Sequence, residues 1–310
     1  MADIPQQLVN GLTNGSLYAL IAVGYTVVYG IVQLINFAHG EVFMIGAFGS
    51  LSTWYFLFRD NTSVWVLPIM LIGAIGASVL TAVIMERVAY RPLRGAPRLA
   101  PLITAIGISI FLQEFVRLFY GDIPGFPSAK AKIPFPRIDV VTGQAFEIGN
   151  VTIQRPALFT MGCLLACSIF LYWFINKTKQ GRAMQAVSQD PDTARLMGID
   201  VDKVIVIAFA VGAALAGIAG VAYGLQNNNI DFRMGFMAGL KAFTAAVLGG
   251  IGNVQGAVVG GLVLGVAEAL AAGVPFIGGT WKDVFAFSLL ILVLVFRPQG
   301  LMGARVVDRA

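Results

Sequence analysis

Long apolar runs recur along the chain, and they restrict its fold more than any other feature does. A helix rises about 1.5 Å per residue, so about 20 apolar residues cross a hydrocarbon core of about 30 Å. Charged residues make up only 12% of the chain, whereas soluble domains carry roughly 25%. The sequence therefore predicts an all-α polytopic membrane protein with about eight transmembrane helices and one short or re-entrant segment. The predicted spans cover residues 12–35, 42–58, 64–85, 99–119, 157–175, 204–225, 254–272 and 284–296, and the short segment covers residues 240–248.

Lysine and arginine indicate how the chain is oriented in its membrane. They gather in residues 86–98, 177–203 and 297–309, each within a few residues of a span end. Such clusters remain in the cytoplasm, so we expect all three on that side and the N-terminus outside, which requires an odd number of crossings. The segment 120–155 holds four prolines and is predicted to be a periplasmic loop. Positive charge spread between apolar runs is unlike a nucleic-acid-binding face, so we expect no nucleic acid partner.

The motifs of common enzymes are missing from the sequence. No GxxxxGK[ST] phosphate loop occurs, and the glycines of "GGIGNVQG" do not have the spacing of a dinucleotide fingerprint. His39 is the only histidine, and Cys163 and Cys167 lie together in an apolar run, so the ligands of a zinc site are lacking. We therefore expect no catalytic residue, no metal site, no cofactor and no ATPase site in this chain.

Two polar or glycine-rich breaks interrupt the apolar pattern. One is "NFAHGE", residues 36–41, and the other is "GGIGN", residues 249–253. The first break is typical of a simple interfacial turn between helices, but transporters also use paired interruptions to expose polar groups to a substrate. We expect both breaks to border a translocation path. Its candidate residues are Asn36, His39, Glu41, Gly250, Gly252 and Asn253, together with Glu268 from a later span.

Ionisable residues inside the predicted spans need oppositely charged partners or contact with water. Glu114 and Arg117 are three residues apart and are predicted to pair. Lys241 lies beside an outer loop, and we expect its ammonium to reach the lipid headgroups. Glu268 has apolar neighbours on both sides and no evident local partner. An interior position in the bundle is the simpler interpretation of Glu268, and a role in transport is the alternative.

The polar segment 181–204 predicts two short surface helices. Apolar residues from Ala183 to Val187 recur at helical spacing. Asp190 followed by Pro191 is typical of a helix start, with Asp190 as the N-cap residue. Gly198 is a candidate C-cap for the second helix. These patterns by themselves indicate only a docking surface.

Four segments of the chain resemble the LivH-type permease of branched-chain amino acid ABC importers. They cover residues 19–41, 86–95, 181–200 and 239–270, in the family's order and across nearly the whole chain. The resemblance implies an ABC importer permease fold, with residues 1–310 forming one transmembrane domain in a bacterial inner membrane. The implied partners are a second homologous permease, two cytoplasmic ABC ATPase subunits and a periplasmic amino-acid-binding protein.

The resemblance also implies a role for residues 177–203, as the cytoplasmic loop that couples to the ATPase. The candidate coupling residues are Gly181, Arg182, Ala186, Asp190, Pro191, Ala194, Arg195 and Gly198. ATP then supplies the driving force, and neutral groups on Asn36, His39 and Asn253 suit a passing amino-acid zwitterion. The alternative is a self-sufficient proton-coupled transporter or channel, in which His39, Glu41 or Glu268 carries protons.

Overall fold

The computed structural model describes residues 4–33, 36–59, 61–97, 99–273, 281–297 and 299–303. The helices are α1 (Ile4–Val32), α2 (His39–Leu57), α3 (Val66–Met85), α4 (Leu99–Phe119), α5 (Arg155–Lys177), α6 (Lys179–Gln189), α7 (Pro191–Leu196), α8 (Val201–Asn227), α9 (Met234–Gly249), α10 (Val254–Ala272) and α11 (Lys282–Phe296). Short helical turns cover Glu86–Tyr90 (η1, a π-helix), Arg91–Leu93 (η2) and Tyr120–Asp122 (η3). The strands are β1 (Ile133–Pro134), β2 (Gln144–Ile148), β3 (Val151–Gln154) and β4 (Asn229–Ile230). The predicted all-α fold class is confirmed.

The predicted spans coincide with helices, and two of them agree to the residue. Helices α4 and α10 match the predicted runs 99–119 and 254–272. Helix α1 begins at Ile4 instead of at residue 12. Its first turns carry polar side chains, which lower the hydropathy without opposing a helix, and Gln6 anchors them by hydrogen bonds with the backbone of Thr152 in β3. Six helices are long and apolar enough to cross a membrane by length and composition: α1, α3, α4, α5, α8 and α10.

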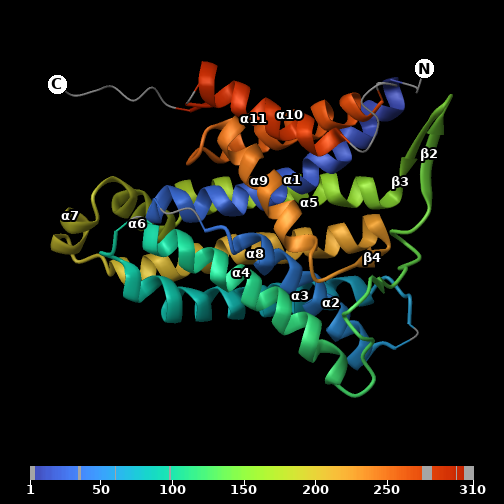
Figure 1. The fold of residues 1–310 in the computed structure, drawn as a ribbon, viewed down its shortest axis with the longest axis horizontal. Coiled ribbons are helices and arrows are strands. Elements are labelled where there is room, and N and C mark those ends of the chain that lie inside the picture. The colour runs from blue at the N-terminus through green and yellow to red at the C-terminus, as the bar shows by residue number, and fades with distance from the viewer. Residues whose placement is uncertain are drawn as a thin grey trace.

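The bundle has two distinct ends, which Figure 1 shows on the right and on the left. The hairpin end carries the antiparallel pair β2–β3 and the two-residue ladder in which β1 pairs with β4. The other end, called the α6–α7 end, carries those two short helices and the start of α8. The segment 120–155 lies wholly at the hairpin end. It contains both strands of the β2–β3 pair, and its strand β1 pairs with β4.

The course of helix α9 bears on whether the number of membrane crossings is odd or even. Its 16 residues begin just after β4 at the hairpin end. It ends next to the chain that follows α11, since Leu301 N–H donates to the carbonyl of Leu248 at 2.8 Å. The segment predicted as either spanning or re-entrant therefore runs from one end to the other. Helices α1–α5 and α8–α11 then alternate in direction, an arrangement compatible with the predicted odd number of crossings.

Close contacts between glycines hold α1 against α10. A Cβ atom at Gly265 would overlap the backbone of Gly15, and a Cβ atom at Gly261 would lie 2.6 Å from Ala19. Small residues at four-residue spacing allow helix backbones to approach in lipid, where no hydrophobic force draws helices together. The close-packing interpretation of the glycine pattern is thus confirmed for this pair of helices.

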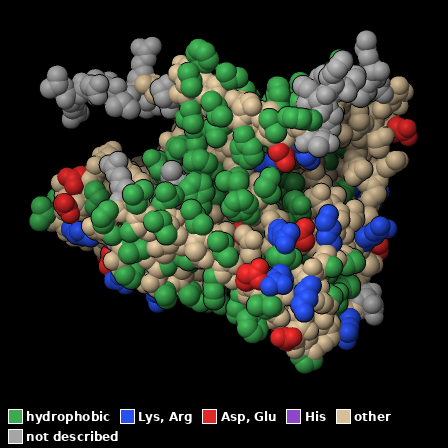
Figure 2. Space-filling view, in the orientation of Figure 1, with side chains coloured by type: hydrophobic (Ala, Val, Ile, Leu, Met, Phe, Trp, Pro, Cys, Tyr) green, Lys and Arg blue, Asp and Glu red, His purple; other side chains and the backbone are tan. Residues whose placement is uncertain are grey.

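Apolar side chains cover the outside of the bundle between its ends. Helix α4 exposes Ile103, Ile106, Ile110, Phe111 and Phe115. Figure 2 shows hydrophobic side chains over the middle of one face, while charged side chains gather toward the two ends. A surface of this kind suits contact with lipid tails, which is the environment that the composition predicted.

Candidate functional site

The two predicted breaks meet at one small pocket. Asn36 and His39 of the first break and Ile251 of the second line it, opposite side chains of α1 and α9. The other lining residues are Tyr25, Val28, Tyr29, Phe243 and Ala246. The pocket volume is about 10 Å³, which is room for about one water molecule. The structure therefore brings together segments that lie more than 200 positions apart in the sequence, and leaves a narrow space between them.

Neutral polar groups line this small pocket. The Oδ1 atom of Asn36 accepts hydrogen bonds from the Tyr90 hydroxyl at 2.7 Å and from the backbone N–H of Ala38 at 3.0 Å. The rings of His39 and Tyr25 meet edge to face, with centroids 4.6 Å apart. Within the part of the chain that the structure describes, Asn36 Nδ2, His39 Nε2 and the Tyr25 hydroxyl are buried without hydrogen-bond partners. These groups can exchange hydrogen bonds with a polar solute without holding it by charge.

Glu41 lies on the same break but does not line the pocket. Its Oε1 atom accepts hydrogen bonds from Ser109 Oγ at 2.9 Å and from Gln113 Nε2 at 2.8 Å, both on α4. The carboxyl is fully buried and also lies against Gly235 at the start of α9. This geometry gives Glu41 the task of joining α2, α4 and α9.

The second break is a tight turn between α9 and α10. Gly250 and Gly252 have φ angles of +107° and +92°, a conformation that favours glycine. Asn253 caps α10, because its Oδ1 atom accepts from the N–H groups of Gln255 at 3.0 Å and Gly256 at 3.3 Å. Its amide nitrogen donates to the carbonyl of Met302 at 3.0 Å. The hydrogen-bonding groups of Asn253 are thus used within the fold, and Ile251 alone represents this break in the pocket lining.

Glu268 belongs to a buried cluster of charges at a different place. Its Oε1 atom lies 2.8 Å from Lys241 Nζ, and that ammonium also lies 2.6 Å from Asp283 Oδ1. The expectation that Lys241 reaches the headgroups is therefore wrong, since Lys241 is only 7% exposed. The partner of Glu268 stands 27 positions away on another helix, so no local pattern could have revealed it. By contrast, the predicted pair of Glu114 and Arg117 is confirmed, with 2.6 Å between carboxylate and guanidinium.

A wider cavity, of about 360 Å³, opens between α1 and α9 toward the hairpin end. It is lined by Asn14, Leu17, Tyr18, Ile21, Tyr223, Asn227, Asp231, Arg233, Met234, Met237, Ala238, Lys241 and Lys282. Sequence analysis missed this cavity. One signal was present, because Gln6, Asn10 and Asn14 repeat at four-residue spacing and give one face of a mostly apolar helix a row of amides.

The α6–α7 end has the local structure that the sequence predicted. The Asp190 carboxylate accepts hydrogen bonds from the N–H groups of Asp192 at 3.0 Å and Thr193 at 3.1 Å, with Pro191 as the first helical residue. Gly198, with φ +83°, ends the turn after α7. Hydrogen bonds from Thr193 hold the pKa of Asp190 below its usual range, so this cap stays charged at neutral pH.

The candidate coupling residues differ in exposure. Gly181 and Ala194 are buried within the chain, Ala186 is half-buried, and Arg182, Asp190, Pro191, Arg195 and Gly198 are exposed. Arg195 pairs with Asp192 at 3.3 Å. The largest exposed apolar side chains of this segment are Leu196 and Met197, at 87% and 78%. Sequence analysis missed both, although two apolar residues directly before a capping glycine were a visible signal.

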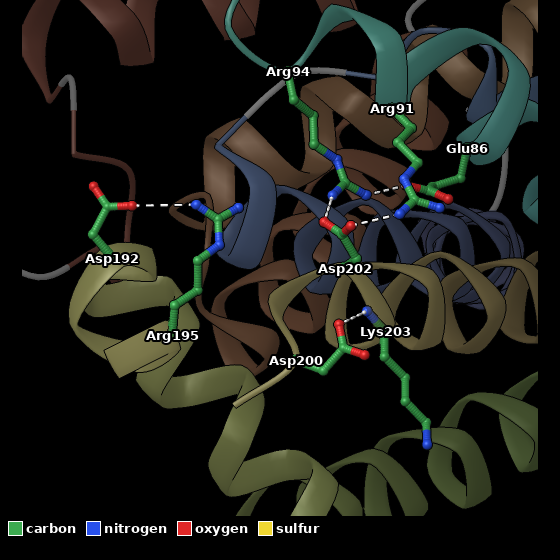
Figure 3. Close-up of polar contacts among 8 residues, drawn as sticks. All are labelled: Glu86, Arg91, Arg94, Asp192, Arg195, Asp200, Asp202 and Lys203. Atoms are coloured by element: carbon green, nitrogen blue, oxygen red, sulfur yellow. Dashed lines mark hydrogen bonds and ion pairs between the residues drawn. The ribbon is translucent and has the colours of Figure 1, made fainter. Parts of the chain in front are cut away.

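A network of charges joins the root of α8 to the end of α3, and Figure 3 shows it close up. Arg91 and Arg94 both pair with Asp202, the former at 2.6 Å, and Arg94 also pairs with the buried carboxylate of Glu86. Glu86 begins η1, and Tyr90 ends it. Because Tyr90 donates to Asn36, this network reaches the lining of the small pocket.

Comparisons with known proteins identify the family of this chain. The family described as "Branched-chain amino acid transport system / permease component" matches residues 7–294. The high-affinity branched-chain amino acid transport system permease protein BraD of Pseudomonas aeruginosa is 46% identical, over 98% of this chain and 97% of that protein. The LivH permease of the corresponding system in Escherichia coli K12 is 44% identical over the same shares. A probable LivH of Methanocaldococcus jannaschii is 26% identical over 98% of this chain and 94% of that protein. The chain therefore belongs to the permease family of branched-chain amino acid transport systems.

Proposed function

We propose that this protein is the membrane-spanning permease subunit of an ATP-driven importer for branched-chain amino acids in a bacterial inner membrane. The observation that carries the coupling part of this proposal is the surface of α7. Leu196 and Met197 project from an end of the bundle that also carries the basic side chains of residues 86–97 and 177–203. Exposed apolar side chains on a polar surface indicate a protein contact, and positive clusters indicate the cytoplasmic side. The proposed contact is with a cytoplasmic ATPase subunit.

The loop 177–203 has a rigid frame for such a contact. Thr178 caps α6 by accepting a hydrogen bond from the N–H of Gly181 at 3.0 Å, and Asp190 caps α7. The side chains of Met184 and Val187, both on α6, are buried within the protein. A framed pair of short helices can transmit a push from a partner to the root of α8. The remaining proposed partners are a second homologous permease, a second ATPase subunit and a periplasmic amino-acid-binding protein at the hairpin end.

We expect the charge network to transmit a movement of α6–α7 to the proposed translocation path. A displacement of the root of α8 moves Asp202, and with it the two arginines that pair with Asp202. Arg94 also holds Glu86 on η1, and Tyr90 at the other end of η1 bonds Asn36 in the pocket lining. An ATP-driven movement at α6–α7 would thus change the width of the small pocket.

The geometry favours this function over proton coupling. Asn36, His39 and Tyr25 offer neutral groups, which allow a zwitterion to pass and leave. Glu41 is hydrogen-bonded to α4, and Glu268 pairs with Lys241. Among the described residues, no hydrogen bond connects His39 to either carboxylate, so a proton would lack a continuous relay.

The test is leucine uptake by proteoliposomes that hold the permease pair, the ATPase pair and the binding protein. Leu196→Glu and Met197→Glu place a charge in the proposed contact and should lower leucine-stimulated ATPase activity by about tenfold or more. Gly198→Val, which strains a left-handed position, should act in the same direction. Ala194→Glu would instead disturb the packing of the loop itself, because Ala194 is 4% exposed.

The matched control is Leu196→Met, which keeps an apolar side chain of similar volume at the same exposed position. That variant should keep its activity. Absence of leucine uptake by the wild-type assembly would contradict the proposed function. Normal stimulated ATPase activity in both Leu196→Glu and Met197→Glu would remove α7 from the coupling mechanism.

A further inference from the structure

One face of α1 lines both the wide cavity and the small pocket. The wide cavity takes Asn14, Leu17, Tyr18 and Ile21 from this helix, and the small pocket takes Tyr25, Val28 and Tyr29. Successive members of this series are separated by one, three or four residues, which keeps them on one side of a helix. The face of α1 therefore runs continuously from a cavity of about 360 Å³ to a pocket of about 10 Å³.

Four charged side chains line the wide cavity: Asp231, Arg233, Lys241 and Lys282. The carboxylates of Glu268 and Asp283, which do not line this cavity, pair with the two lysines and balance their charge. Lys241 is tightly held, with carboxylate oxygens at 2.8 and 2.6 Å. Lys282 is loosely held, because its ammonium lies 3.9 Å from Glu268 Oε1 and its side chain is 47% exposed. Among the described residues, Lys282 has no ion-pair partner closer than this one, so its ammonium can bind a further anionic group.

This cluster of charges also contains a carboxylate oxygen that is free to accept a further donor. The side chain of Glu268 is 4% exposed, and within the described ranges its Oε2 atom has no hydrogen-bond partner. Glu268 and Lys282 both line a neighbouring cavity of about 450 Å³, and Lys282 lines the wide cavity as well. The half-exposed ammonium of Lys282 therefore lies at the junction of two cavities, and the buried carboxylate of Glu268 lies 3.9 Å from it at the second one.

Five residues of the lining are apolar and suit contact with a small aliphatic group. Leu17 and Ile21 come from α1, and Met234, Met237 and Ala238 come from α9. Methionine adapts its shape to different partners, which suits side chains that differ in branching. The cavity volume of about 360 Å³ lies within the range of small-molecule sites.

We propose that the junction of this cavity with the neighbouring one is a binding site for the amino-acid zwitterion before it reaches the small pocket. The α-carboxylate binds Lys282, which lines both cavities, and the α-ammonium binds Glu268 on the side of the neighbouring cavity. The aliphatic side chain packs against Leu17, Met234 and Met237. A zwitterion adds no net charge, so the cluster remains balanced when it is occupied, and no isolated charge is buried. This inference rests on the proposed function, from which the class of cargo is taken, and adds the position and the polar contacts of the site.

The first experiment measures protection of the cavity in the assembled transporter without its binding protein. Met237→Cys, in a background with Cys163→Ala and Cys167→Ala, is treated with a membrane-impermeant thiol reagent. Leucine should slow the labelling, whereas isocaproate, which lacks the ammonium, and isoamylamine, which lacks the carboxylate, should not. Adding Lys282→Gln should weaken the protection by leucine about tenfold, the loss expected for one charge-assisted hydrogen bond.

The second experiment measures the KM of leucine uptake in the complete assembly. Lys282→Gln and Met237→Trp should raise it by about tenfold, the former by removing a charge-assisted contact and the latter by filling the cavity. Phe236→Trp is the matched control, since Phe236 neighbours Met237 on α9 but is absent from the cavity lining. Its KM should equal that of the wild type.

The outcomes separate this inference from the proposed function. If the wild-type assembly does not import leucine, the proposed function fails. If it imports leucine, while Lys282→Gln and Met237→Trp leave the KM unchanged and leucine gives no protection at position 237, the function stands and the binding site is overturned.

Discussion

The two spaces along α1 differ in both width and charge. The wide cavity near the hairpin end holds about 360 Å³ and is lined by four charged side chains, Asp231, Arg233, Lys241 and Lys282. The small pocket holds about 10 Å³ and is lined by the neutral groups of Asn36, His39 and Tyr25. Charged side chains thus line the wider space and are absent from the lining of the narrower one.

The difference in width has a cause in the packing. Near the small pocket, glycines bring helices into backbone contact: a Cβ atom at Gly24 would lie 2.6 Å from His39 Nε2 and 2.9 Å from the carbonyl of Gly212. Around the wide cavity, larger side chains, among them Tyr18 of α1 and Met237 of α9, line the space between the two helices. Substitutions in either region test whether the two spaces contribute in the way that this comparison suggests.

The largest effect is expected at the charge cluster of the wide cavity. Lys241→Met leaves the carboxylates of Glu268 and Asp283 without their closest cation. Removing one partner of a buried ion pair costs about 3–5 kcal/mol, so the free energy of unfolding should fall by that amount. Thermal unfolding in detergent measures it. The double variant Lys241→Met with Glu268→Met should recover part of the loss, and a single variant as stable as the wild type would refute the structural role of the cluster.

The next effect concerns the contact that supports both spaces. Gly265→Val forces α1 away from α10, because any side chain there overlaps Gly15. Overpacking of this kind costs about 1–3 kcal/mol or more, and the yield of monodisperse protein after extraction should drop. Gly162→Val on α5 is the control, since a Cβ atom at Gly162 meets nothing within 4 Å. Equal yields for the two variants would show that the α1–α10 contact is not critical.

A smaller effect is expected in the small pocket, where polarity matters more than charge. His39→Gln should keep most leucine uptake, whereas His39→Leu should lower it about tenfold, because a polar solute then loses about 1.4 kcal/mol of hydrogen bonding in the narrow space. Initial uptake rates at matched protein amounts provide the measurement. Uptake that follows the titration of a histidine and disappears equally in both variants would support proton coupling instead.

The smallest effect is expected at the hydrogen bond between η1 and the pocket. Tyr90→Phe removes the hydroxyl that donates to Asn36 Oδ1 at 2.7 Å. The free energy of unfolding should fall by about 1 kcal/mol. Leucine-stimulated ATPase activity and thermal unfolding should both change modestly. Tyr172→Phe, at an exposed position of α5, should change neither. A transport rate that is unaffected by Tyr90→Phe would disconnect η1 from the translocation path.

The sequence by itself determined the features that depend on neighbours along the chain. The apolar runs that became α4 and α10 agree with the structure to the residue, because a span is recognised from its own length and hydropathy. Asp190, Pro191 and Gly198 framed α7 as predicted, since capping hydrogen bonds reach only two to four residues. The pair of Glu114 and Arg117 was predictable for the same reason.

The tertiary structure alone decided which of these segments meet. Lys241 and Glu268 pair across 27 positions, and Asn36 and Ile251 share a pocket across more than 200. The placement of Glu41 against α4, the capping role of Asn253 and the wide cavity likewise depend on how the helices cross. Those crossings follow from close approaches between glycines on distant helices, such as Gly15 and Gly265. Hydropathy and local spacing do not predict such approaches. An apolar helix face is equally stable against lipid or against another helix, so only the detailed fit of two helix surfaces selects the partner.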